Sequence, residues 1–145
     1  MKRLVLVTLI FCALWFLFED KSFACSCAPS ESAKEALKES SAVFTGRLVS
    51  ARLVKDPELG EEIEATFRVD SYWKGVKAQE TTVFTPSSGV ACGKELTIGQ
   101  WYLVFASASY DRKGKLVVTK CGRTKFLYDR QAQRDVKDLG VGKSF

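Results

Sequence analysis

Two cysteines one residue apart, Cys25 and Cys27, are the residues whose type and spacing best suit specific chemistry. Two more, Cys92 and Cys121, lie far downstream, whereas Cys12 falls in an apolar N-terminal run. Four cysteines in a small exported chain are typical of disulfides. A bridge between Cys25 and Cys27 would close a very tight, strained loop, so two long-range pairings remain open. Either pairing fixes the N-terminal segment to distant parts of the chain. Each bridge should stabilise the fold by on the order of 4 kcal/mol.

The first 24 residues have the pattern of a signal peptide. Two basic residues precede the apolar run Leu4–Phe18, which is shorter than the roughly 20 apolar residues that span a bilayer. Ser22 and Ala24 put small side chains at the −3 and −1 positions of a cleavage site. Cleavage there predicts a secreted single domain, residues 25–145, that is not inserted in the membrane.

The composition excludes several classes of function. The chain has no histidine, which removes Ser-His-Asp and Cys-His catalysis and every His-based metal site. We therefore expect no enzymatic activity and no cofactor. The formal net charge of +5 is too small to indicate a nucleic-acid partner by itself.

Two groups of charged residues could carry chemistry, and a structural explanation is favoured for both. Basic residues beside aromatic ones could line a groove for single-stranded nucleic acid. A solvated charged face beside core aromatic residues suits an exported protein better. The residues are Lys113, Lys115, Lys120, Arg123 and Lys125, with Trp101 and Phe126. Three glutamates, Glu61, Glu62 and Glu64, are expected to form a solvated edge and not a catalytic pair. We expect no nucleic-acid partner.

Periodicity predicts five strands and two short helices. A capping-box pattern begins at Ser32, and Asp129 is placed to cap a last helix that ends at Gly140. Gly46 within the first strand indicates a bulge or sharp bend. The expected strands are Ala42–Val54, 62–70, Thr81–Thr85, Trp101–Ala106 (buried on both faces) and Leu116–Cys121. Five bent strands with little helix predict an all-β, five-stranded barrel of the OB type, with a β-sandwich as the alternative.

The opening motif together with the two further cysteines resembles the N-terminal, netrin-like domain of the tissue inhibitors of metalloproteinases. The resemblance covers nearly the whole of 25–145 and is carried by Cys25–Pro29, Val43–Gly46, Tyr72–Gly75, Cys92-Gly93 before Gly99–Leu103, and Leu116–Cys121. Residues 30–37 lack the further cysteine of the animal inhibitors, and their His-Pro-Gln stretch and C-terminal domain are missing. These differences imply a minimal relative with two disulfides.

The resemblance implies a function and a site. It implies the pairing Cys25–Cys92 and Cys27–Cys121, and a monomer that inhibits zinc metalloendopeptidases of the metzincin type. In such inhibition the main-chain nitrogen and oxygen of Cys25 chelate the zinc of the protease, which keeps a position open for water. Ser26 then enters the specificity pocket, with Cys27 and Ala28 as further contacts.

Two alternatives to inhibition remain. The cysteines can be structural crosslinks only, which would make the protein a non-inhibitory extracellular OB-fold binding module. Lipidation of Cys25 would instead anchor a lipoprotein and would exclude chelation, because neither the amine nor the thiol would be free. Ser22 in place of the usual −3 leucine, and the bulky Phe23, disfavour lipidation.

Overall fold

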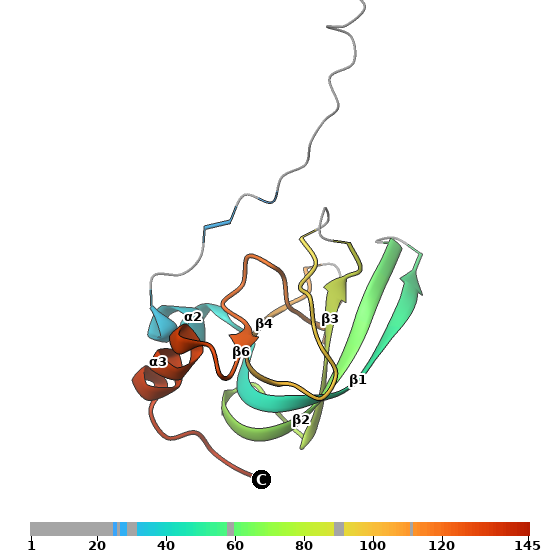
Figure 1. Cartoon of the computed structure of the whole chain (residues 1–145). Helices are drawn as coiled ribbons and strands as arrows, with labels where there is room; N and C mark the ends of the chain where they lie inside the picture. The colour runs from blue at the N-terminus through green and yellow to red at the C-terminus, as the bar shows by residue number, and fades with distance from the viewer. Residues whose placement is uncertain (1–24, 26, 29–31, 58–59, 89–91, 111) are drawn as a thin grey trace, which may run out of the picture.

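The computed structural model of the 145-residue chain describes residues 25, 27–28, 32–57, 60–88, 92–110 and 112–145. The predicted signal peptide (1–24) and Ser26 lie outside these residues. The molecule is mostly β-sheet with two short helices packed together at one side (Figure 1).

The sheet closes on itself through five strands. The strand order is β1-β2-β3-β5-β4-β6, and β1 also pairs with β4, so β1, β2, β3, β5 and β4 form a ring. Every pairing is antiparallel except that of β3 with β5. The elements are α2 (Ala33–Glu39), β1 (Ala42–Asp56), β2 (Gly60–Lys74), β3 (Glu80–Pro86), β4 (Trp101–Ala108), β5 (Leu116–Val117), β6 (Lys125–Phe126) and α3 (Arg130–Leu139).

Gly46 lies in the part of the long strand β1 that pairs with both β2 and β4. The pairing register between β1 and β2 shifts between Thr45 and Gly46, which confirms the predicted irregularity. A Cβ at position 46 would lie 2.8 Å from the carbonyl oxygen of Arg68, too close for any side chain. Glycine is therefore required where β2 approaches the backbone of β1.

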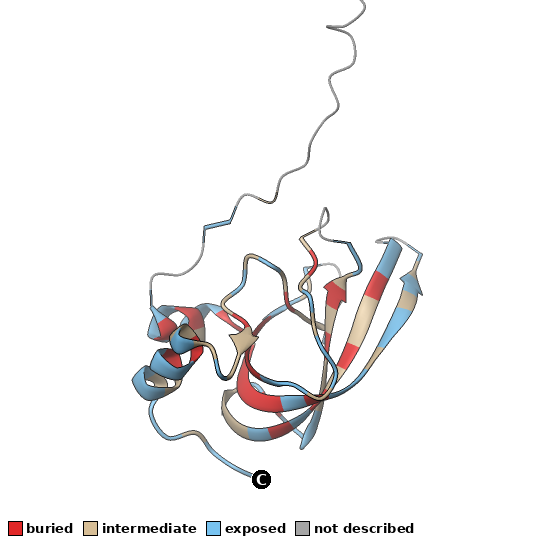
Figure 2. Cartoon of the chain, viewed as in Figure 1, coloured by how far each residue is buried: buried red, intermediate tan, exposed pale blue. Residues whose placement is uncertain are grey.

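Two apolar clusters hold the fold together, one on each face of β4. Phe67 packs edge-on against Phe44 and Tyr102, with ring centroids 5.7 Å apart in both pairs, in the cluster enclosed by the ring. The second cluster joins Leu103 and Phe105 to the helices, whose buried faces are visible in Figure 2. Alternate residues of β4 enter different clusters, which confirms burial on both faces for residues 102–106. Trp101, the first residue of the strand expected to be buried, is instead 43% exposed, so the expectation is wrong at this residue.

Both helices begin at the predicted caps. The Ser32 hydroxyl accepts from the backbone N–H of Glu35, and the Glu35 carboxylate accepts from the N–H of Ser32, both at 3.2 Å. The Asp129 carboxylate accepts from the N–H of Gln131 at 2.7 Å, and α3 ends at Gly140. Neither helix, nor any other within the described ranges, is long and apolar enough to cross a membrane.

Three further expectations need correction. The strand expected over Leu116–Cys121 pairs only at Leu116–Val117, because the chain then turns and Cys121 bonds to Cys27. A further short strand, β6, pairs with β4. Glu62 is 4% exposed, so the predicted solvated edge is wrong at this position; its carboxylate is covered by Arg112.

Candidate functional site

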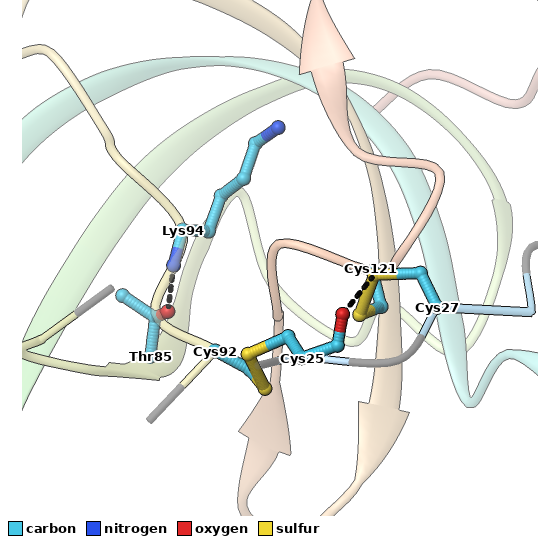
Figure 3. The surroundings of a disulfide bond; sticks show 6 residues. All are labelled: Cys25, Cys27, Thr85, Cys92, Lys94 and Cys121. Atoms are coloured by element: carbon cyan, nitrogen blue, oxygen red, sulfur yellow. Dashed lines mark hydrogen bonds between the residues drawn. A yellow bond between two sulfur atoms is a disulfide. The ribbon is translucent and has the colours of Figure 1, made fainter. Parts of the chain in front are cut away.

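Two disulfides hold the segment that contains Cys25 and Cys27. They join Cys25 to Cys92, with Cα atoms 5.7 Å apart, and Cys27 to Cys121, with Cα atoms 4.9 Å apart (Figure 3). This is the pairing that the resemblance implied. Sequence separations of 67 and 94 residues mean that both bridges fix the N-terminal segment to distant parts of the chain.

The segment that carries Cys92 is itself anchored to the ring. The N–H of Lys94 donates to the hydroxyl of Thr85, a fully buried residue of β3, at 2.8 Å. Gly93 packs so closely on β3 that an added Cβ would lie 2.1 Å from the carbonyl oxygen of Pro86. Neighbouring bonds therefore fix the backbone on the C-terminal side of Cys92 to the sheet.

The two disulfide-bearing segments are also bonded to one another. The N–H of Lys120, next to Cys121, donates to the carbonyl oxygen of Cys92 at 2.8 Å. Cys25 and Cys27 are thus crosslinked to two adjacent segments whose relative position is set by a backbone hydrogen bond. This arrangement restricts the N-terminal segment at two residues that are separated by one intervening residue.

The crosslinked segment lies at the surface. Cys25 is half-buried, whereas Cys27 and Ala28 are exposed. The carbonyl oxygen of Cys25 lies 3.9 Å from Sγ of Cys27 (dashed in Figure 3), which is a van der Waals contact because a disulfide sulfur carries no hydrogen. Ser26 lies outside the described residues, between these two fixed cysteines.

An ion pair at α3 supports the position of Cys121. The guanidinium of Arg123 donates to the carboxylate of Asp135 at 2.7 and 2.8 Å, and Asp135 is 1% exposed. The hydrogen bonds to Asp135 raise the pKa of Arg123 above its ordinary value. The chain just beyond the Cys27–Cys121 bridge is therefore tied to α3, a contact that the sequence pattern did not reveal.

The predicted basic patch is divided by the fold. Arg123 is committed to Asp135, and Lys115 lies 3.7 Å from Glu62 and 4.2 Å from the ring centroid of Phe84. Lys120 and Lys125 instead line a pocket with Lys94. The five basic residues do not form one continuous binding face.

The described residues contain no cluster of three or more His, Cys, Asp or Glu side chains that could hold a metal ion. All four cysteines after position 24 are consumed in disulfides and offer no thiolate.

In comparisons with known proteins, no family model matches this chain and no curated protein matches it significantly. The fold and site define a mostly β domain, crosslinked by two long-range disulfides that indicate an oxidising compartment. Its function is therefore argued from the geometry of the crosslinked segment.

Proposed function

We propose that residues 25–145 form a secreted, monomeric inhibitor of zinc metalloendopeptidases, built on an OB-fold of the netrin-like group. The observation that carries the proposal is the attachment of Cys25 and Cys27 to two segments that are hydrogen-bonded to each other. The ring of five strands, the bulge at Gly46 and the outer helices support the OB-fold assignment.

The proposed chemistry needs only main-chain atoms of Cys25. Signal cleavage after Ala24 converts its backbone nitrogen to a primary amine, whose ordinary pKa of about 7.7–8.0 leaves a neutral fraction near neutral pH. The amine and the carbonyl oxygen of the same residue can close a five-membered chelate on the protease zinc and displace its water. Ser26 then occupies the specificity pocket, and Cys27 and Ala28 contact the cleft.

Rigidity explains how so short a segment could inhibit. A free peptide loses conformational entropy on binding, and this loss weakens its affinity. Here the bridges from Cys25 and Cys27 restrict the segment before it meets a protease, while Cys27 and Ala28 stay exposed. The protein itself acts as neither enzyme nor cofactor carrier in this proposal, and nucleic acid is not a partner.

One residue added ahead of Cys25 tests the proposal. An alanine at that point turns the amine into an amide nitrogen, which is a poor zinc ligand, and leaves both disulfides and Ser26 in place. Losing a central anchor costs about 2–4 kcal/mol, so inhibition should weaken thirtyfold to thousandfold. The measurement compares parent and extended protein against a panel of secreted metzincins, with N-terminal sequencing and circular dichroism as controls for cleavage and folding.

Equal inhibition by both proteins would exclude chelation. If the parent inhibits no protease on the panel, the non-inhibitory binding module becomes the better proposal. The lipoprotein alternative is disfavoured by the Cys25–Cys92 disulfide, because that bond uses the sulfur to which a lipid would be attached. The intact mass of the exported protein distinguishes a lipidated Cys25 from a disulfide-bonded one.

A further inference from the structure

A second surface feature lies apart from the crosslinked segment. Between the chain after Cys92 and strand β6 is a pocket of about 490 Å³, within the size range of small-molecule sites. The side chain of Lys94 extends away from the Cys25–Cys92 disulfide (Figure 3). We call this the lysine pocket and define it by Lys94, Thr97, Tyr102, Lys120, Lys125 and Phe126.

The three ammonium groups of the lysine pocket form no ion pair in the described part of the chain, whereas Arg52, Arg68, Arg112, Lys115 and Arg123 all do. Burial, and then the positive charge of Lys125, lower the pKa of Lys94 below its ordinary value. Lys94 and Lys125 therefore lie close enough for their positive charges to repel each other.

Two carboxylates also border the pocket, but they do not neutralise it. Asp129 caps α3 by accepting from the N–H of Gln131 at 2.7 Å, and this bond is the main cause of its lowered pKa. Glu95 is exposed and raises the pKa of Lys94 less than Lys125 lowers it. Three lysines and two carboxylates line the pocket, so positive charge exceeds negative charge by one and the pocket can accept a further negative charge.

Tyr102 forms the inner wall of the lysine pocket. Its side chain is fully buried, and its hydroxyl accepts from the N–H of Thr97 at 2.7 Å. This bond holds the segment after Cys92 against β4, so the inner wall of the pocket is rigid.

Phe126 gives the same pocket an apolar side. Its ring stacks on Tyr102 at a centroid distance of 4.8 Å and on Tyr128 at 5.1 Å, which fixes its orientation. A fixed aromatic ring beside cationic groups suits a ligand with an apolar part and a charged head.

We propose that the lysine pocket binds a small organic oxyanion, whose phosphate or carboxylate group lies among Lys94, Lys120 and Lys125. The apolar part of the ligand packs against the edge of the Phe126 ring. Nothing in this proposal depends on Cys25 or on protease inhibition.

Calorimetric titration of the disulfide-bonded protein with phenyl phosphate, benzoate and inorganic phosphate tests the proposal. We expect a Kd of about 1 mM or tighter for at least one organic probe at low salt, and weaker binding at high salt. Phenol, which has the aromatic ring without the negative charge, is the control and should not bind. The probe that binds best distinguishes a phosphate from a carboxylate site. Lys94→Met and Lys125→Met should each weaken binding by about tenfold or more, because each removes a charge-assisted hydrogen bond.

Lys113→Met is the matched control, since Lys113 is exposed and does not line the pocket. Absence of binding by every probe, or equal binding by parent and Lys94→Met, would overturn the proposal. Because the extension ahead of Cys25 should leave anion binding unchanged, failure of one proposal is distinguishable from failure of the other.

Discussion

The guanidinium of Arg112 donates two hydrogen bonds to the carboxylate of Glu62, whose side chain is only 5% exposed. Asp56 accepts a further bond from Arg112, and the ammonium of Lys115 lies 3.8 Å from Asp56. The bonds to Glu62 raise the pKa of Arg112 above its ordinary value. This cluster fastens the connection between β4 and β5 onto the hairpin of β1 and β2, 50 residues earlier in the chain.

Arg112→Met should strongly destabilise the fold. The substitution removes the guanidinium that binds two nearly buried carboxylates, and breaking a buried ion pair costs about 3–5 kcal/mol. Urea unfolding measures the loss. Arg52→Met is the matched control, because the Arg52 side chain is 72% exposed in its pair with Glu64 and an exposed pair contributes about 0–1 kcal/mol. Similar losses for the two variants would contradict a buried cluster.

The native domain should contain no reactive thiol. Both bridges span long loops, so removing either, as Cys25→Ser with Cys92→Ser or as Cys27→Ser with Cys121→Ser, should cost about 4 kcal/mol. Thiol titration before and after denaturation, peptide mapping of the bridges and unfolding of each double variant are the measurements. Two titratable thiols in the native protein would rule out this framework.

Sequence patterns found the features that a few neighbouring residues determine. Ser32 and Asp129 could be recognised as caps because a cap and the N–H groups it binds lie within three residues. Gly46 stood out within an extended run, and the continuous apolar stretch Trp101–Ala106 indicated a strand buried on both faces. These predictions are confirmed, except that Trp101 itself is 43% exposed.

Features that depend on distant partners were missed. Glu62 lies in an alternating strand pattern that predicts exposure, and it is buried because a loop 50 residues later covers it. Asp135 was not singled out within its helix, although it is 1% exposed and bonded to Arg123. Cysteine spacing left two long-range pairings open, since spacing does not encode which segments lie together. The lysine pocket was missed because Lys94 and Lys125 meet only in the fold.

Asp129→Ala should destabilise the domain by about 1 kcal/mol, because the first turn of α3 loses its cap. Asp129→Asn retains a capping oxygen and is the control, which should cost much less. The carboxylate has a lowered pKa in the folded state, mainly through the bond from Gln131. Its contribution is therefore present above about pH 3.9, the ordinary pKa of aspartate, and is lost as the pH falls through the lower folded pKa.

Urea unfolding of the three proteins between about pH 2 and pH 7 checks this dependence. The difference between parent and Asp129→Ala should be constant near neutral pH and should shrink at the acid end. A difference that grows with acid would show that the carboxylate is not stabilised by the helix.

Substitutions at Ser26 should change selectivity far more than stability. Because Cys25 and Cys27 hold the chain on either side, and Cys27 is exposed, Ser26→Gly and Ser26→Arg should alter the free energy of unfolding by no more than about 0.5 kcal/mol. If Ser26 enters the specificity pocket, a long charged side chain must lose its hydration in an apolar pocket, which is unfavourable. Ser26→Arg should thus inhibit proteases with apolar pockets much less than the parent does, whereas Ser26→Gly tests loss of the hydroxyl alone. The measurement is the inhibition constant of each variant across the metzincin panel, with unfolding curves as the control for folding. Parent-like inhibition of every susceptible protease by Ser26→Arg would place Ser26 outside the pocket, even if chelation by Cys25 holds.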